Sequence, residues 1–227
     1  MKIVILAAGI GSRLGNPYPK TLTTLKNGQK ILEHQIGNLT QYFNKYDIMV
    51  VVGFKKELIM EEQPDLLFIY NPDFDQTNTS KSLLRALYKC KSESVLWLNG
   101  DVVFEPEVII KLLKTIEKEQ SFVAVNNSAV GDEEVKYSLT GEGFISEISK
   151  QVVNAPGEAV GINFISSGHI NSFIQSLEQC GPNDYFEKGL ELSIRRDGID
   201  ILPVDISEFK CIEVDFREDL DNANTIF

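Results

Sequence analysis

Residues 3–20 read IVILAAGIGSRLGNPYPK, and this stretch decides the fold. Its apolar start predicts a buried strand, which runs directly into a turn of small residues. Without large side chains the main chain can approach a ligand closely, and its N–H groups can point at phosphate oxygens. Arg13 and Lys20 add two cations that suit phosphate, a planar fork and a movable point charge. The stretch therefore predicts a site for a nucleoside triphosphate, with a backbone wall made of Ala7, Ala8, Gly9, Gly11 and Ser12.

Two common phosphate-binding loops do not fit this stretch. A dinucleotide-binding loop needs a third glycine where Leu14 stands, and an acid at the end of the second strand, where 52–55 reads VGFK. A Walker A loop needs glycine before its lysine, but Pro19 precedes Lys20. Both loop types are disfavoured.

Composition restricts the class of protein further. The chain has 227 residues, 43% of them hydrophobic, which is enough for one domain with a substantial core. It shows no membrane-spanning apolar run and no signal region, so a cytoplasmic protein without a membrane partner is expected. The net charge of −11 argues against nucleic acid as a partner. Three scattered cysteines, at positions 90, 180 and 211, suggest neither a disulfide framework nor a metal site.

Apolar runs alternate with helical patterns along the first half. Strands are expected at 2–7, 48–53, 66–70, 94–98 and 121–126, and helices within 32–43, 83–87 and 109–116. This alternation predicts an α/β fold with a mostly parallel sheet and helices on both faces. Ligands of such sheets bind at the carboxyl ends of the strands. In the second half we expect two strands within 134–150, strands at 159–166 and 211–214, helices at 168–178 and 184–195, and a short C-terminal helix.

Residues 6–13 followed by Pro19-Lys20 match the pattern L-A-A-G-x-G-[ST]-R, a short spacer, then P-K. In this the chain resembles the nucleotidyltransferases that act on sugar phosphates and on small alcohol phosphates. The resemblance implies a Rossmann-like, glycosyltransferase-A-like mixed sheet with a small inserted β-region. It implies one domain over 1–227, with a nucleotide-binding part at 1–126, an acceptor-binding part at 127–210 and a metal-binding strand at 211–215. It also implies that Leu6 and the small residues after it hold the nucleotide.

Two aspartates stand just past apolar strands. Asp101 follows LWLNG at 96–100, and Asp215 follows IEV at 212–214. Mg²⁺ takes few protein carboxylates and keeps positions open for phosphates and water, so two aspartates suffice. In the resembled family an aspartate at each of these places binds the metal that bridges the nucleotide phosphates. For Asp101 a turn or helix-cap role is the alternative.

The scarcity of histidine narrows the reaction. The chain has only His34 and His169, which disfavours a Ser-His-Asp hydrolase. A phosphate monoester is already largely a dianion at neutral pH, so its attack on an α-phosphate needs no strong base. The remaining work is to place two anions in line and stabilise the leaving pyrophosphate. Arg13, Lys20 and Mg²⁺ suit that work, and the first two are the candidate catalytic residues.

The segment 71–83, NPDFDQTNTSKSL, contains T-N-x-x-x-S-L. This form is closer to the phosphocholine and aminoethylphosphonate cytidylyltransferases than to the sugar-phosphate enzymes. In the family this turn faces the base and sugar, which nominates Asn78, Thr79 and Ser80, although Asn78 or Thr79 is also suited to cap a helix. The second half also resembles that branch, which includes the phosphoglutamine cytidylyltransferases of capsule modification. Its candidate acceptor-binding residues are Lys136, Lys150, Glu158 and Glu187, with Asp184 and Glu213 as further acids.

These observations give one leading hypothesis. The chain transfers CMP from CTP to a small phosphorylated amine or amino acid, of phosphoglutamine or phosphocholine type, and releases pyrophosphate with Mg²⁺. Transfer to a sugar 1-phosphate from UTP, dTTP, GTP or CTP is the nearest alternative. A catalytically silent nucleotide-binding subunit is the alternative from another class. A homodimer is a possible assembly that the sequence does not decide.

Overall fold

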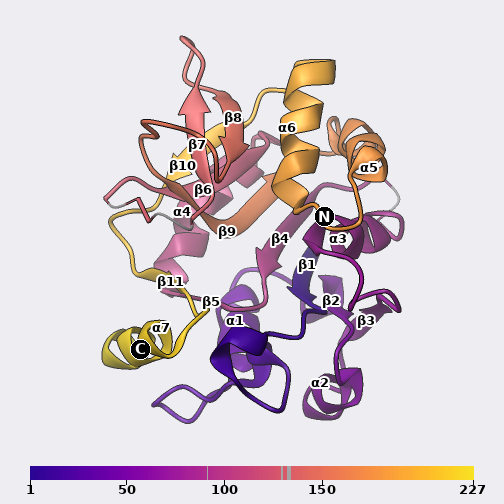
Figure 1. The fold of residues 1–227 in the computed structure, drawn as a ribbon, viewed down its shortest axis with the longest axis vertical. Coiled ribbons are helices and arrows are strands. Elements are labelled where there is room, and N and C mark those ends of the chain that lie inside the picture. The colour runs from indigo at the N-terminus through magenta and orange to yellow at the C-terminus, as the bar shows by residue number, and fades with distance from the viewer. Residues whose placement is uncertain (91, 129, 132–133) are drawn as a thin grey trace.

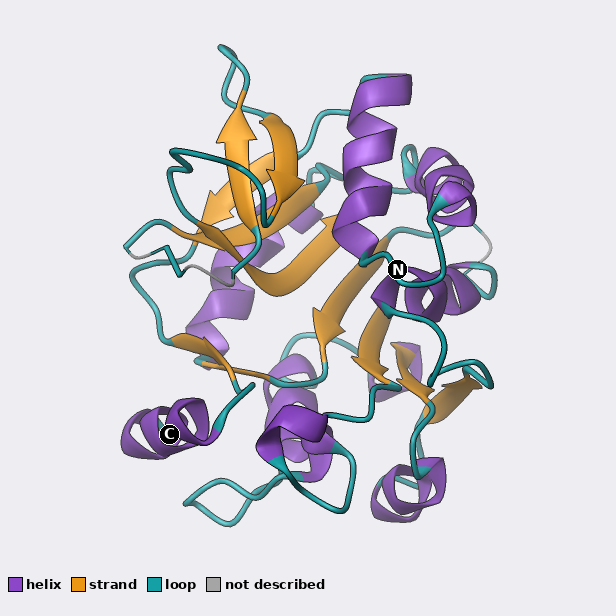
Figure 2. Ribbon diagram, in the orientation of Figure 1, coloured by secondary structure: helices purple, strands orange, loops and turns teal. Residues whose placement is uncertain are grey.

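The computed structural model describes residues 1–90, 92–128, 130–131 and 134–227. A mixed sheet runs through the molecule with helices on both faces (Figures 1 and 2). Its strands follow the order β10-β6-β9-β4-β1-β2-β3. Those strands are β1 Lys2–Ala7, β2 Ile48–Val52, β3 Leu67–Tyr70, β4 Val95–Asn99, β6 Phe122–Asn126, β9 Glu158–Ile165 and β10 Leu202–Asp205. The fold is the expected α/β class.

The sheet is parallel at its centre and antiparallel around one strand. β1 lies between β2 and β4, both parallel to it, and Ile5 pairs with Val50 on one side and Leu98 on the other. β9 runs antiparallel to β4 and β6. The inserted β-region is the hairpin of β7 Lys136–Leu139 and β8 Ile145–Ser149, which joins the sheet where Lys136 pairs with Glu158. The carboxyl ends of β1, β2, β3 and β4 share one edge, as the alternating pattern predicts.

Each face of the sheet has its own apolar layer, because successive strand residues point to opposite faces. Val4 and Leu6 belong to the layer that contains Leu83, Phe173 and Leu190. This layer is covered by α3 Thr79–Leu87, α5 Ile170–Gln179 and α6 Phe186–Asp197. Ile3 and Ile5 belong to the layer covered by α1 Ile31–Leu39, α2 Lys56–Glu62 and α4 Pro106–Ile116.

A two-stranded ribbon lies beside the main sheet. β5 Val102–Phe104 pairs antiparallel with β11 Cys211–Glu213, and α7 Arg217–Ile226 follows (Figure 1). The ribbon brings the C-terminal strand back against the end of β4, because the N–H of Val214 donates to the carbonyl of Asp101 at 3.0 Å. Sequence periodicity misses β5, β10 and α2, which have three, four and seven residues. No helix in the part of the chain that the structure describes has the length and apolar character to cross a membrane.

Candidate active site

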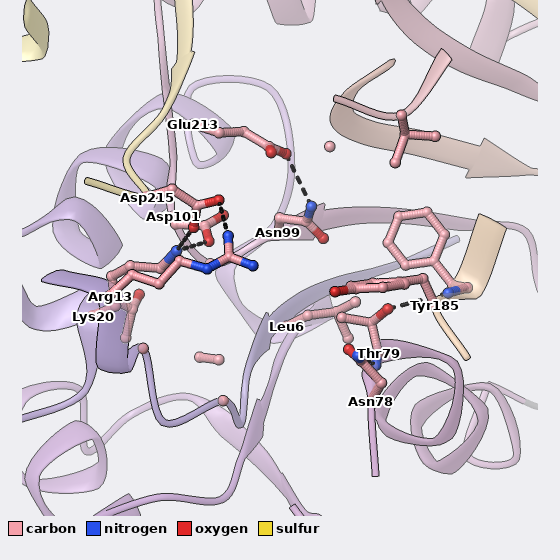
Figure 3. Close-up of a pocket in the computed structure, with 18 of the residues that line it drawn as sticks. Leu6, Arg13, Lys20, Asn78, Thr79, Asn99, Asp101, Tyr185, Glu213 and Asp215 are labelled. Carbon is pink, nitrogen blue, oxygen red and sulfur yellow. Dashed lines mark hydrogen bonds and ion pairs between the residues drawn. The ribbon is translucent and has the colours of Figure 1, made fainter. Parts of the chain in front are cut away.

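A cavity of about 640 Å³ opens at the carboxyl ends of β1 and β4 (Figure 3). The first half of the chain contributes Leu6, Ala7, Gly9, Gly11, Ser12, Arg13, Lys20, Asn78, Thr79, Asn99 and Asp101 to its wall. The second half contributes Glu134, Lys150, Gly161, Tyr185, Phe186, Glu187, Glu213 and Asp215, among others. Ala8 and Ser80 of the expected nucleotide-binding set do not line it. The carbonyl of Ala8 instead accepts the N–H of Phe54 at 3.1 Å, and Ser80 is fully buried.

Lys20 packs closely against Gly11 of the glycine-rich turn. Gly11 has φ +63°, in the left-handed region, and a Cβ there would meet the Cβ of Lys20 at 2.8 Å. Glycine is therefore required for residue 20 to fold back over the turn. The ammonium group of Lys55 donates to the carbonyl of Pro17 and anchors the far end of the same loop.

Lys20 lies between the two aspartates that the sequence nominates. Its ammonium contacts a carboxylate oxygen of Asp101 and lies 2.6 Å from one of Asp215. The Nη1 atom of Arg13 lies 2.8 Å from the other Asp215 oxygen. Burial raises the pKa of Asp215, but the charges of Lys20 and Arg13 outweigh it and hold that pKa below its usual range. Burial lowers the pKa of Lys20, and the two aspartates outweigh it and raise that pKa. Figure 3 shows the four side chains gathered on one side of the cavity.

The two aspartates have the chemistry of a Mg²⁺ site. The Oδ1 atom of Asp101 is buried without a hydrogen-bond partner, and Asp215 lies two residues after β11, next to Val214, which bonds to the carbonyl of Asp101. Hard carboxylate oxygens are the ligands that Mg²⁺ prefers, and it often takes only one or two of them. Among the described residues no group of three or more His, Cys, Asp or Glu side chains is arranged to hold a metal. Two carboxylates are enough for a Mg²⁺ ion that takes its other ligands from elsewhere.

Glu213 belongs to the same wall, two residues before Asp215. Its Oε1 atom accepts a hydrogen bond from the Nδ2 atom of Asn99 at 3.0 Å. Gly161 makes room for this pair with φ +69°, since a Cβ there would collide with Glu213 and lie 2.8 Å from the Asn99 amide nitrogen. Burial raises the pKa of Glu213 well above its usual value, and Asp101 adds to the effect. The sequence names Glu213 only as one acid among several, while its two-residue spacing from Asp215 in a strand is the signal that places both on one face.

At the α3 end of the cavity, residues that begin the helix also line the cavity wall. Asn78 is the N-cap of α3, and its side chain accepts the N–H of Thr79 at 2.8 Å. The hydroxyl of Thr79 accepts the N–H of Phe186 at 3.1 Å. Both residues line the cavity opposite the charged group (Figure 3). The helix-cap role of Asn78 is thus observed, and it leaves the residue at the cavity wall.

Two of the four expected acceptor-binding residues line the cavity. Lys150 and Glu187 do, and Glu187 is only 8% exposed. Lys136 and Glu158 pair in the sheet behind it, where the Oε2 atom of Glu158 accepts the N–H of Gly131 at 2.8 Å. The cavity is also lined by four residues that are not predicted as site residues from the sequence: Asn99, Glu134, Gly161 and Tyr185.

Both histidines serve the scaffold. The Nε2 atom of His34 lies 2.9 Å from the carbonyl of Phe104, and Nδ1 of His169 lies 2.9 Å from the hydroxyl of Ser121. Neither side chain is among those that line the cavity.

A family model described as a MobA-like NTP transferase domain matches residues 3–185. The chain belongs to this family. It is 36% identical over 121 residues to a CMP-5'-(3-aminopropyl)phosphonate synthase from Streptomyces rubellomurinus, a match covering 49% of the chain and 19% of that protein. The chain spans less than a third of the length of the curated relatives it matches first.

Two solved structures share the fold along almost the whole chain. One is a CTP:phosphocholine cytidylyltransferase from Streptococcus pneumoniae, with TM-score 0.77, 17% identity, and 99% and 98% of the two chains covered. Another is a putative glucose-1-phosphate thymidylyltransferase from Bacillus anthracis, with TM-score 0.76, 18% identity, and 100% and 94% covered. At these identities the likeness concerns the fold.

Proposed function

We propose that the chain is a Mg²⁺-dependent cytidylyltransferase that transfers CMP from CTP to a small phosphorylated amine or amino acid and releases pyrophosphate. The observation that carries the proposal is the position of Lys20, whose ammonium lies between Asp101 and Asp215 beside the glycine-rich turn. A cation and two carboxylates on one side of a cavity, with backbone N–H groups nearby, suit a triphosphate and its metal.

The chemistry requires little proton transfer. An oxygen of the acceptor phosphate forms a bond to the α-phosphorus of CTP, and the bond from that phosphorus to the oxygen of the β-phosphate breaks. Because the acceptor phosphate is largely a dianion, no base has to remove a proton first. The two electrons of the broken bond leave with pyrophosphate.

The residues of the wall have separate tasks in this proposal. The backbone of Leu6, Ala7 and Gly9 holds the base and ribose, together with Asn78 and the backbone of Thr79, whose hydroxyl accepts the N–H of Phe186. Lys20 and Arg13 neutralise charge on the α-phosphate and on the leaving group. Asp101 and Asp215 would hold Mg²⁺, which when bound neutralises phosphate charge and orients the triphosphate. Lys150 approaches the acceptor phosphate.

Support for cytosine comes from two sources. The T-N-x-x-x-S-L segment is closer to the cytidylyltransferases than to the sugar-phosphate enzymes, and the Streptomyces relative and the Streptococcus neighbour are named for CMP and CTP. In this proposal the enzyme acts in the cytoplasm, and capsule biosynthesis is the pathway that the resemblance to the phosphoglutamine enzymes suggests. A sugar 1-phosphate acceptor is the second candidate, favoured by the fold shared with the Bacillus protein.

The test is pyrophosphate release from CTP with Mg²⁺ and a phosphorylated amine. Wild type and Asp47→Asn should release pyrophosphate, because Asp47 pairs with Lys2 away from the cavity. Asp101→Ala should release none above background. Release by Asp101→Ala at the wild-type rate would refute the metal assignment. Binding of CTP without release from any acceptor would favour the silent subunit instead.

A further inference from the structure

Two carboxylate oxygens of the cavity are buried without a hydrogen-bond partner among the described residues: Oδ1 of Asp101, assigned above to the metal, and Oε2 of Glu187, which has no role in the transfer site. Glu187 lies in the first turn of α6 and lines the cavity, and its Oε2 atom is buried without a hydrogen-bond partner. An unsatisfied buried carboxylate is costly, so such groups are normally paired or reserved for a ligand. Burial raises the pKa of Glu187 to about 7, against the opposing charge of Lys150. A ligand in the cavity could donate the hydrogen bond that this oxygen lacks.

The surroundings of Glu187 are acidic. Glu134 and Glu213 line the same cavity as Glu187. Burial and Glu158 raise the pKa of Glu134. Carboxyl groups gathered in one cavity favour a ligand that brings a positive charge.

Lys150 lines the same cavity as Glu187 and the two aspartates. Its charge lowers the pKa of Glu187, although burial acts against it. The cavity therefore offers cations for a phosphate group and carboxylates for a cationic group. An acceptor that carries both a phosphate and a cation matches this lining.

Three aromatic side chains line the cavity among the described residues. Phe186 is 1% exposed and meets Trp97 edge to face at 5.5 Å, so it presents no open face. Tyr185 and Phe216 are 43% and 46% exposed, and each already has a cation near its ring, Lys150 at 5.8 Å and Arg13 at 5.7 Å from the centroid. A quaternary ammonium group is typically recognised by several aromatic faces that surround it, and here it would share the two exposed rings with like charges.

We infer that the acceptor carries a cationic nitrogen with N–H bonds, held by Glu187, and that the site disfavours a quaternary ammonium. This inference rests on the proposed function and selects one class of acceptor within it. A primary ammonium donates to the unpartnered Oε2 atom and brings its charge to the acidic wall. A trimethylammonium group brings the charge but has no N–H to donate.

Three probes with the same two-carbon link to phosphate separate these contributions: aminoethyl phosphate, propyl phosphate, which matches its shape without the charge, and phosphocholine, which keeps the charge but replaces the three N–H bonds with methyl groups. At pH 8, above the pKa of Glu187, wild type should use aminoethyl phosphate at least 10-fold better than either other probe in kcat/KM. Glu187→Gln keeps the shape and removes the charge. It should lower kcat/KM for aminoethyl phosphate by about 10- to 100-fold, the range for a charged hydrogen bond, and change propyl phosphate less than threefold.

Glu191→Gln is the matched control. Glu191 lies one turn further along α6, is 6% exposed, and is paired with Lys188 and Arg195. It should leave the order of the three probes unchanged. Equal use of phosphocholine and aminoethyl phosphate by wild type, or an equal loss for all three probes in Glu187→Gln, would overturn the inference while the proposed function stands.

Calorimetric binding of the same probes to wild type with CTP and Ca²⁺ gives a readout that does not need turnover. Tighter binding of aminoethyl phosphate than of phosphocholine supports the inference even if no pyrophosphate is released, an outcome that would refute only the proposed function. The reverse order of affinities overturns it. Unchanged CTP binding by Glu187→Gln shows that this variant is folded.

Discussion

The hydroxyl group of Thr79 accepts a hydrogen bond from the backbone N–H of Phe186 at 3.1 Å. This contact joins the first turn of α3 to the first turn of α6, across 107 residues of sequence. The backbone N–H of Asn78 adds a bond to the carbonyl of Pro182 at 2.8 Å. The nucleotide end and the acceptor end of the cavity are thus tied through one short segment.

Thr79→Val should therefore affect the acceptor more than the nucleotide. Valine keeps the shape but leaves the Phe186 N–H unpaired, at a cost of about 1–3 kcal/mol in the free energy of unfolding. We expect a higher KM for the acceptor and a nearly unchanged KM for CTP. Steady-state kinetics check this, and Thr79→Ser should restore the wild-type values. A rise in the KM for CTP alone would contradict the role assigned to the hydroxyl.

Gly161→Ala should lower the free energy of unfolding more than an alanine substitution at another glycine with a similar φ angle. At Gly161 the new Cβ would collide with Glu213 and lie 2.9 Å from Val102, whereas Gly198, at φ +62°, has nothing within 4 Å. Gly198→Ala should cost about 1 kcal/mol from its backbone alone, and Gly161→Ala about 2–4 kcal/mol. Urea unfolding of the two variants measures the difference. Equal costs would mean that the Glu213 wall is not tightly packed.

The raised pKa of Glu187 predicts how stability depends on pH. The folded state holds a proton up to about pH 7, and the unfolded state loses it near 4.5, so this group's stabilisation declines as pH rises through that window. Relative to wild type, Glu187→Gln should gain about 3 kcal/mol in free energy of unfolding between pH 4 and pH 8. Urea unfolding at both pH values tests this. A difference that does not change with pH would show that Glu187 titrates normally.

Lys20→Met should nearly abolish turnover and should also weaken the fold. It removes the ammonium from between Asp101 and Asp215, side chains that are 21% and 34% exposed. We expect a loss of 100-fold or more in kcat, as for other groups that neutralise transition-state charge. The melting temperature should fall by a few degrees at neutral pH and recover in part when Mg²⁺ is added. Pyrophosphate release and a thermal scan measure the two effects.

Most of the fold follows from local pattern. The long strands are predicted by their apolar runs, and α4 and α5 by the helical spacing of their apolar residues. The alternation of strands and helices predicts the edge of the sheet where ligands bind. The expected strand at 211–214 is found as β11, but β5 has only three residues and is missed, and the pairing of Cys211 with Phe104 is set by tertiary contact. That pairing nevertheless carries Asp215 to the cavity. A motif and a strand end could predict the two aspartates, but not the ribbon that joins them.

The residues of the acceptor side are harder to predict from sequence for a physical reason. The phosphate loop is contiguous, so the spacing of its residues forms a motif that can be recognised. Glu187, Glu213 and Asn99 come from a helix, the C-terminal strand and β4, and only folding brings them to one wall. Lys136 and Glu158 look equally suitable in sequence, yet they pair in the sheet behind the cavity.

The central claim is transfer of CMP to a phosphorylated amine at the cavity of Lys20, Asp101 and Asp215. Its most direct test is a mass spectrum of the products formed from CTP, Mg²⁺ and aminoethyl phosphate. The account predicts a CDP-linked acceptor and an equal amount of pyrophosphate, both absent with Asp101→Ala. Intact CTP after incubation with every acceptor offered, or its hydrolysis to CMP without a linked product, would contradict it.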